Sequence, residues 1–216
     1  MSSFPWRLVT VDIDGTITRV HGWREIARTF GRLAEFDDTT RRFRAGTIGE
    51  DEHLSNLLDI AAGHTVTEVE AVLERTPVID GIAEGITRLH AQGARAALLT
   101  HNPDYVAAWY RRRFGFDAAE GVASQPIVHG QIGRAVGTRA DKPGGMRALL
   151  ARYGVPASTA VHVGDGTSDA EVFRIVGGGV ALNSPFPEVN RVADLALSTD
   201  DFRVVVDRIA EIRPRT

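Results

Sequence analysis

Hydrophobic and polar positions follow two alternating patterns along most of the chain. Short apolar or β-branched runs, bounded by turn residues, predict strands at residues 7–12, 94–100, 159–164, 178–182 and 194–198. Helical patterns, several of which open with Pro or close with Gly, lie between them at 82–93, 103–115, 143–154 and 168–177. Residues 126–136 are typical of a β-hairpin that turns near Gly130. Because such apolar runs suit strands buried on both faces, the order of elements predicts an α/β fold with a Rossmann-like, doubly wound parallel sheet.

Residues 18–77 interrupt this alternation. They contain no strand-like run, and their four helical patterns lie at 22–33, 39–46, 50–63 and 67–75. Pro77 closes the segment where the chain returns to the sheet. We therefore predict a core of residues 1–17 and 78–216, with a small all-helical cap, residues 18–77, inserted after the first strand.

Composition and charge narrow the class of protein. The 216 residues are 43% hydrophobic and 25% charged, which is ordinary for a globular protein. A net charge of −3 gives no general case for binding nucleic acid or a membrane surface, and the basic run 111–113 is typical of a solvated helix face. The absence of cysteine excludes disulfides, thiolate metal sites and cysteine nucleophiles.

The chain also carries no pattern that would direct it to a membrane. The N-terminal sequence shows no charged leader followed by an apolar segment, so we expect no signal peptide. No apolar run is long enough to span a bilayer. These observations predict a cytoplasmic protein without a membrane partner, and we expect a monomer or a homodimer.

Acidic residues gather where predicted strands end. Asp12 and Asp14 close the first strand, and residues two apart on a strand share a face. Asp165 and Asp169 follow the third strand, and Thr100 ends the second. In an open α/β sheet, ligands bind beyond the carboxyl ends of the strands. Unpaired carboxylates at one edge would repel one another, so the sequence predicts a hard divalent cation there, with Mg²⁺ as the cofactor.

Lys142 is the chain's one lysine among 25 Lys and Arg residues. Arginine replaces lysine well on a surface, but not where a compact, pivoting point charge is needed. Lys142 begins the helix that leads into the third strand, which directs it to the same edge as the carboxylates. We therefore predict that it contacts a phosphoryl oxygen and pairs with Asp12, which would keep that carboxylate ionised.

Four sequence pieces in this order resemble the haloacid dehalogenase superfamily of phosphohydrolases. They are "DIDGT" (12–16), Thr100, Lys142 and "GDGTSD" (164–169). The helical insert resembles that superfamily's cap placed after the first strand, and the longer stretches around the first and last motifs resemble its phosphoserine-phosphatase-like branch. The resemblance covers the core and implies a HAD-like fold that acts on a small phosphorylated metabolite.

The resemblance also implies a role for each motif residue. Asp12 would attack phosphorus and form an aspartyl-phosphate, and Asp14 would act as general acid and then as general base. Thr100 and Lys142 would hold phosphoryl oxygens. The residues that would hold Mg²⁺ are Asp12, Asp14 through its backbone carbonyl, Asp165, and Asp169 as a ligand or as an orienting residue.

Departures from that branch concern the substrate more than the chemistry. His21 stands where the branch has an acidic cap residue that reads the substrate ammonium. The helix of residues 49–62 has no arginine to read the substrate carboxylate, and His101 and Asn102 follow Thr100 where glycines are usual. These differences make phosphoserine a doubtful substrate.

Several residues stay candidates for the substrate pocket or have simpler explanations. His101 and Asn102 are candidates for binding the phosphate, and His21 and Trp23 for contacting the substrate. For Trp23, packing inside the cap is the more typical explanation. The remaining histidines lack metal-ligand spacing and are typical of surface or core positions; they are His53, His64, His90, His129 and His162.

Three alternatives to a phosphatase remain open at this point. A phosphotransferase or phosphomutase would use a second hydroxyl in place of water. A non-catalytic phospho-receiver or binding module would need Asp12 and a metal, but no acid and base at Asp14. A metal-free dehalogenase would need neither the second carboxylate of D-x-D nor the GDG-x-x-D loop.

Overall fold

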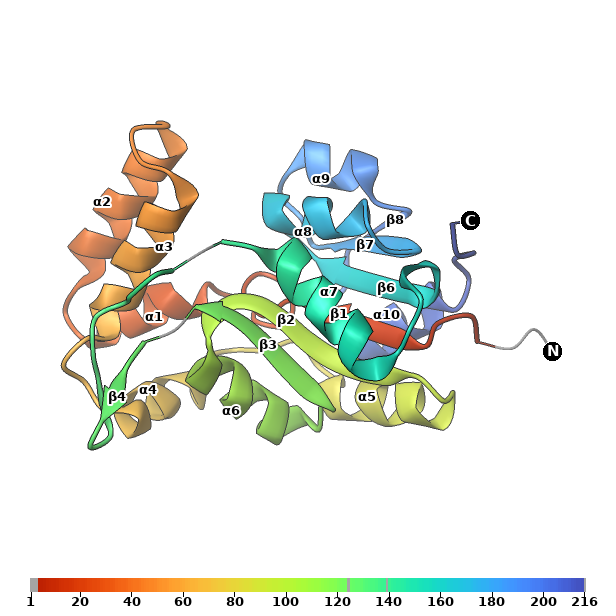
Figure 1. Ribbon diagram of the computed structural model, residues 1–216, viewed down its shortest axis with the longest axis horizontal. Coiled ribbons are helices and arrows are strands. Elements are labelled where there is room, and N and C mark those ends of the chain that lie inside the picture. The colour runs from red at the N-terminus through yellow and green to blue at the C-terminus, as the bar shows by residue number, and fades with distance from the viewer. Residues whose placement is uncertain (1–3, 124, 139, 216) are drawn as a thin grey trace.

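The computed structural model describes residues 4–123, 125–138 and 140–215, and a six-stranded sheet lies at its centre (Figure 1). The spatial order is β3-β2-β1-β6-β7-β8, and all neighbouring pairs run parallel. The strands are β1 (Leu8–Val11), β2 (Arg95–Pro103), β3 (Ala118–Ala123), β6 (Ala160–Gly164), β7 (Gly178–Leu182) and β8 (Leu195–Leu197). This arrangement confirms the predicted α/β class and doubly wound sheet.

Helices cover both faces of the sheet. One face carries α5 (Ile82–Ala91), α6 (Asp104–Phe114) and α10 (Phe202–Ile209), and the other α7 (Lys142–Tyr153), α8 (Thr167–Phe173) and α9 (Pro187–Val192). Side chains alternate accordingly along β1, where Leu8 packs toward α7 and α8 while Val9 and Val11 pack on the opposite side. The same alternation directs Thr10 and Asp12 to the α7 side, where the candidate site lies.

Two strands differ from the sequence prediction, and helices α9 and α10 were not predicted. The edge strand β3 was not predicted, because its described sequence contains Ala, Glu and Gly, which are uncommon in strands. Strand β2 extends beyond Thr100 to Pro103, with an irregular register against β3 between these residues. The irregularity changes the direction of the side chains that follow Thr100.

The segment predicted as a cap is helical and lies beside the carboxyl ends of the strands (Figure 1). Its elements are α1 (Gly22–Thr29), α2 (Leu33–Arg44), α3 (Glu50–Leu58), the short 3₁₀ turn η1 (Asp59–Ala61) and α4 (Val66–Leu73). The predicted end of the first helix, at residue 33, and the predicted start of the second, at residue 39, were wrong. Gly31 adopts a φ of 70°, and the chain turns there before Leu33 begins α2. The division into core and cap at residue 77 stays a prediction.

The predicted hairpin is confirmed and packs against the helical segment. Strands β4 (Ile127–Val128) and β5 (Gln131–Ile132) pair antiparallel around Gly130. The backbone N–H of Gly63 donates to the carbonyl of Ile132 at 2.8 Å, and that of Ile132 donates to the carbonyl of His64 at 2.8 Å. The hairpin is therefore hydrogen-bonded to the helical segment, although our prediction assigned its residues to the core.

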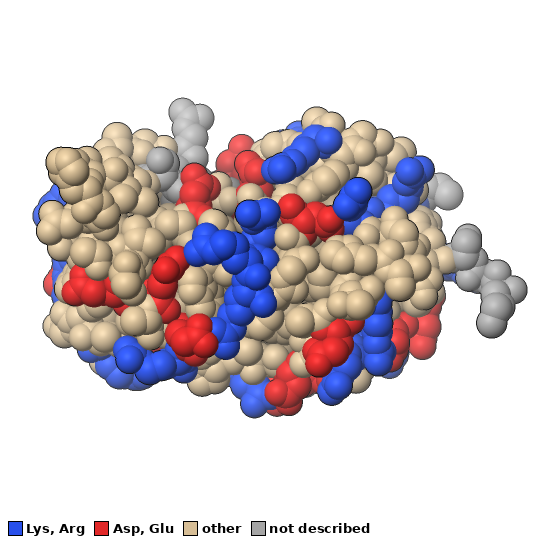
Figure 2. All heavy atoms as spheres, turned by 90° about the horizontal axis from the view of Figure 1, so that it is seen from below, with Lys and Arg blue, Asp and Glu red and all other residues tan. Residues whose placement is uncertain are grey.

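Charges of both signs cover the face formed by α4 and α6. Figure 2 shows a short band of arginine side chains in the middle of the underside of the molecule, with acidic side chains on both sides of it. Arg112 pairs with Glu70 at 2.7 Å, and Arg113 pairs with Glu74, so two members of the basic run join α6 to α4. Among the helices of the described residues, none is both long and apolar enough to cross a membrane.

Candidate active site

The candidate site begins at the carboxyl end of β1. Asp12 follows the strand directly, and its N–H donates to the carbonyl of Val163 at 2.9 Å, which holds it beside the end of β6. The chain then turns at Gly15, whose φ is 76°. A Cβ atom at Gly15 would lie 2.4 Å from Oδ2 of Asp165, so glycine is required both for the turn and for the close approach of that carboxylate.

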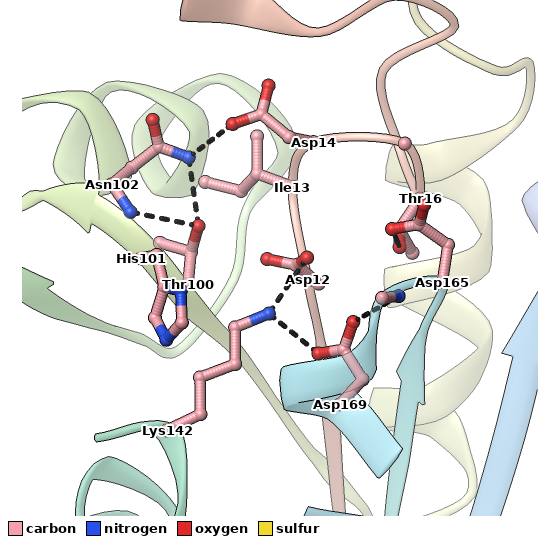
Figure 3. A network of polar contacts seen from close by, with 12 residues as sticks. Asp12, Ile13, Asp14, Thr16, Thr100, His101, Asn102, Lys142, Asp165 and Asp169 are labelled. Carbon is pink, nitrogen blue, oxygen red and sulfur yellow. Dashed lines mark hydrogen bonds and ion pairs between the residues drawn. The ribbon is translucent and has the colours of Figure 1, made fainter. Parts of the chain in front are cut away.

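Lys142 lies between two carboxylates, as Figure 3 shows. Its Nζ lies 2.9 Å from Oδ2 of Asp12 and 2.6 Å from Oδ1 of Asp169, and its side chain is 2% exposed. Asp141 caps α7 by accepting the N–H of Gly144 at 2.7 Å, which places Lys142 at the first residue of the helix. The predicted pairing of Lys142 with Asp12 is therefore present.

Asp169 is a fully buried carboxylate with several donors. Its Oδ1 accepts from both Lys142 and Nε2 of His162, the latter at 2.8 Å, and its Oδ2 accepts the N–H of Gly166 at 2.9 Å. Thr10 Oγ1 lies 2.8 Å from His162 Nδ1 and fixes the other side of the ring. With its oxygens engaged in this way, Asp169 is better suited to orient Lys142 than to bind a metal directly.

Asp165 has the opposite surroundings. Only the hydroxyl of Thr16 donates to its side chain, at 3.3 Å, and within the described residues it has no ion-pair partner. Burial, followed by the charges of Asp12 and Asp169, raises the pKa of Asp165 to about 8. This carboxylate is therefore the group in the cluster that most needs a cation.

The nucleophile candidate is affected by the same charges. Burial raises the pKa of Asp12 to about 6, Lys142 acts to lower it, and Asp169 raises it again. Burial opposes ionisation of Asp169 as well, yet Lys142 and the hydrogen bond from His162 hold its pKa below the ordinary value. Lys142 is itself buried, and Asp12 and Asp169 together hold its pKa above the ordinary value. The ion-paired forms are thus the stable ones near neutral pH.

The donor set fits a hard divalent cation. One oxygen each from Asp12, Asp165 and Asp169 can be chosen so that all three lie within 4.8 Å of one another. Three carboxylates face a single ammonium group, so an excess of negative charge remains when all are ionised. Asp12 and Asp165 offer carboxylate oxygens for direct ligation, while Asp169 adds negative charge beside them, and oxygen ligands suit Mg²⁺ rather than a softer metal.

The Asp14 carboxylate lies outside this cluster and points toward the helical segment (Figure 3). Strand β1 ends at Val11, so strand alternation does not carry Asp14 to the face of Asp12. Its Oδ1 accepts the N–H of Gly22 at 2.6 Å, and its Oδ2 accepts from Nδ2 of Asn102 at 2.9 Å. The carboxyl group is thus free of the acidic cluster and available for proton transfer.

Thr100 keeps a donor for a ligand. Its Oγ1 accepts from the backbone N–H of Asn102 at 3.2 Å and from the Asn102 side chain at 2.9 Å. Both contacts use the oxygen as an acceptor, which leaves the hydroxyl proton free to donate. Asn102 itself has both amide protons engaged, so its contacts do not favour the predicted role in binding phosphate.

The residues predicted to contact the substrate lie where the helical segment meets the sheet. His21 Nδ1 is 3.7 Å from Oδ1 of Asp14, and its ring meets Phe36 edge-on. Trp23 is buried in the core, as its alternative explanation predicts, and it also donates to Asn102 at 2.8 Å. Trp23 therefore joins the helical segment to the site.

His101 lies beside a residue that sequence reasoning missed. Its Nδ1 is 3.8 Å from Oε1 of Glu50, the first residue of α3, and its Nε2 is buried without a hydrogen-bond partner among the described residues. Burial and the charge of Lys142 lower the pKa of His101 to about 3, so the ring is neutral. Burial raises the pKa of Glu50. No motif marked Glu50, because its place depends on how α3 packs.

His162 was interpreted as a surface or core residue, and its contact with Asp169 was not predicted. A signal was present in the sequence, because His162 lies two residues before Gly164 in a strand. Alternation puts these two residues on one face of the strand, and in the fold Gly164 packs against Asp169, whose Cγ would lie 2.2 Å from a Cβ atom there.

Comparison with known proteins supports this picture. A model of the family described as haloacid dehalogenase-like hydrolase matches residues 6–177. Phosphoserine phosphatase SerB2 of Mycobacterium tuberculosis is 29% identical over 198 residues, which cover 89% of this chain and 47% of that protein. A phosphoserine phosphatase of Archaeoglobus fulgidus is 26% identical over 199 residues, covering 90% and 57%. The chain thus spans about half the length of these two curated relatives.

Solved structures share the fold. A HAD family hydrolase from Salmonella enterica serovar Typhi has a TM-score of 0.85 at 19% identity, covering 92% of this chain and 69% of that one. A substrate-bound phosphoserine phosphatase has a TM-score of 0.80 at 21% identity, covering 94% and 98%. The family model, the curated relatives and the fold agree with the resemblance noted in the sequence, and the protein belongs to the haloacid dehalogenase-like hydrolase family.

Proposed function

We propose that this protein is a Mg²⁺-dependent phosphatase that hydrolyses a small phosphomonoester through an aspartyl-phosphate on Asp12. The observation that carries the proposal is the buried ammonium of Lys142 between Asp12 and Asp169, with Asp165 completing three carboxylates at the strand ends. Phosphoryl transfer depends mainly on positioning and on stabilising negative charge, and this arrangement supplies both.

The reaction has two steps that use this chain's own groups. Asp12 attacks phosphorus, the P–O bond to the substrate alcohol breaks, and Asp14 donates a proton to the departing oxygen. Asp14 then accepts a proton from a water molecule that attacks the phosphorus of the aspartyl-phosphate, which releases inorganic phosphate and restores Asp12. Because the pKa of Asp12 is about 6, the nucleophile is ionised at neutral pH.

Lys142 and the hydroxyl of Thr100 would hold the phosphoryl oxygens during both steps. Asp12 and Asp165, with the backbone carbonyl of Asp14, would hold Mg²⁺, and Asp169 would orient Lys142. The bound cation would neutralise charge on the phosphoryl group and on Asp165.

The leaving-group side of the site supports a substrate other than phosphoserine. His21 and the neutral ring of His101 lie there, and helix α3 contains no arginine that could pair with an α-carboxylate. Glu50 is the acidic side chain that contacts this region from α3. An organic acid would present a carboxylate to Glu50 with no arginine of α3 to pair with it, so we propose a phosphorylated sugar as the substrate class.

The proposal is tested with purified protein, p-nitrophenyl phosphate, and either Mg²⁺ or EDTA. We expect turnover with Mg²⁺, its loss in EDTA, and a loss of at least about 10³-fold in Asp12→Asn, because no nucleophile remains. Asp37→Asn serves as the matched control, since Asp37 is exposed and its ion pair with Arg24 is long, at 3.8 Å. Substantial turnover by Asp12→Asn would refute the nucleophile assignment. A panel of sugar phosphates, organic-acid phosphates and phosphoserine then ranks substrates, and phosphate transfer to added alcohols distinguishes a phosphotransferase.

A further inference from the structure

The side chain of Asn102 has a partner for each of its polar groups. Nδ2 donates to Oδ2 of Asp14 and to Oγ1 of Thr100, both at 2.9 Å, and Oδ1 accepts from the indole N–H of Trp23 at 2.8 Å. An indole nitrogen can only donate, so the amide oxygen must face Trp23 and the amide nitrogen must face Asp14. Asn102 is 4% exposed, so water competes little with these contacts. Trp23 therefore determines the orientation of the Asn102 amide.

Asp14 is held from two separate parts of the chain. The donor to Oδ1 is the backbone of Gly22, the first residue of α1, at 2.6 Å, and the donor to Oδ2 is Asn102, near the end of β2. Each carboxyl oxygen retains a second lone pair, so the group can still carry a proton. Two donors on opposite oxygens leave the carboxyl one orientation, which Figure 3 shows directed away from the acidic cluster.

We infer, on the basis of the proposed phosphatase function, that Asn102 and Trp23 are positioning residues for the general acid Asp14. Trp23 sets the Asn102 amide, and the amide aims the Asp14 carboxyl at the oxygen of the leaving alcohol. Because Trp23 and Gly22 lie on α1 and Asn102 lies on the sheet, the acid is fully aligned only when α1 is seated on the sheet. The position of the helical segment thereby controls proton donation.

The inference predicts a defect that depends on the leaving group. An alkoxide needs a proton as it departs, whereas p-nitrophenolate is a weak base and departs without one. A misaligned acid therefore slows hydrolysis of an alkyl phosphate much more than hydrolysis of p-nitrophenyl phosphate. Loss of the Asn102–Thr100 contact would instead affect both esters equally, because both present the same phosphoryl group to Thr100.

The test compares kcat/KM for glycerol 2-phosphate and p-nitrophenyl phosphate in Mg²⁺, because kcat/KM covers only the steps up to departure of the alcohol. We expect Asn102→Ala to lose about 100-fold on the alkyl ester and less than about 5-fold on the aryl ester, since general acid catalysis contributes about 10²–10⁴-fold. Trp23→Phe should lose about 3–10-fold selectively on the alkyl ester.

Trp6→Phe is the matched control. Trp6 is equally buried, and its indole N–H donates to the carbonyl of Ile209 at 2.8 Å, but it precedes β1 at the opposite end of the sheet. It should lower the thermal midpoint as Trp23→Phe does, while leaving the ratio of the two kcat/KM values unchanged. Equal losses on both esters in folded Asn102→Ala, or a changed ratio in Trp6→Phe, would overturn the positioning role. A wild-type protein that hydrolyses neither ester would overturn the proposed function itself, and the positioning role with it.

Discussion

The acidic end of the sheet and the surface of the helical segment that meets it are built in different ways. At the sheet, the side chains of Asp12, Lys142 and Asp169 are at most 9% exposed and their ion pairs are 2.6–2.9 Å long. Across from them, the side chains of His21 and Glu50 are each 45% exposed, and the nearest partners of their polar atoms, Asp14 and His101, lie at 3.7 and 3.8 Å. The comparison indicates that the groups proposed for the chemistry are held rigidly, whereas those proposed for recognising the leaving group are loosely held.

At the acidic end of the sheet, a substitution of Lys142 should have the largest effect on activity. We expect Lys142→Arg to lower kcat/KM for p-nitrophenyl phosphate by about 10²–10³-fold, because a planar guanidinium cannot occupy the position of a buried ammonium between two carboxylates. Steady-state kinetics with a parallel thermal melt measures the effect. Arg147→Lys, the reverse exchange at an exposed position of the same helix, is the control and should be silent. Near-normal kinetics for Lys142→Arg would mean that the lone lysine has no special role.

Without the metal, repulsion among the carboxylates should make the free energy of unfolding depend on pH. The pKa values of Asp165 and Asp12, about 8 and about 6, lie above the ordinary 3.8, so between these values the folded protein binds more protons than the unfolded chain. The two raised pKa values make stability fall as pH rises from about 4 to about 8 in the metal-free protein. The lowered pKa of His101 acts in the opposite sense up to about pH 6.5, its ordinary value, so the decline set by Asp165 is clearest between about pH 6.5 and 8. A loss of about 2 kcal/mol lowers the thermal midpoint by roughly 4–8 °C.

Thermal melts at pH 5 to 8, in EDTA and in Mg²⁺, measure this dependence. Mg²⁺ should restore the midpoint most at pH 8, because the cation binds the ionised carboxylates. Asp165→Asn should flatten the decline in EDTA, since it removes the group with the most raised pKa. A midpoint that rises with pH in EDTA across this range would contradict the charge assignment.

Substitutions on the surface of the helical segment that meets the sheet should have small effects, and these effects should change substrate preference rather than the overall rate. We expect His21→Glu to raise the ratio of kcat/KM for phosphoserine over glycerol 2-phosphate by about 2–5-fold, because a half-exposed carboxylate attracts an ammonium group only modestly. His21→Gln, of similar size but uncharged, is the control and should leave the ratio unchanged. An equal ratio in both variants would remove His21 from the substrate-reading surface.

Much of the acidic end could be predicted because short-range rules apply there. Residues 12–16 and 164–169 follow buried strands directly, and the carboxyl ends of parallel strands meet at one edge of the sheet. The solitary lysine drew attention to residue 142 before any contact was known. Strand β3 was missed because pairing with β2, rather than its own composition, makes it a strand.

The contacts around Asp14 could not be predicted in the same way. Asn102 and Trp23 are 79 positions apart, and His101 and Glu50 meet only because α3 begins beside β2. The sequence by itself determined five of the six strands of the sheet, the helical insert and the residues that form the acidic cluster, because local patterns and strand ends specify them. Only the tertiary structure decided where Asp14 points, what Asn102 does and which side chains face the leaving group, because those depend on how distant elements pack.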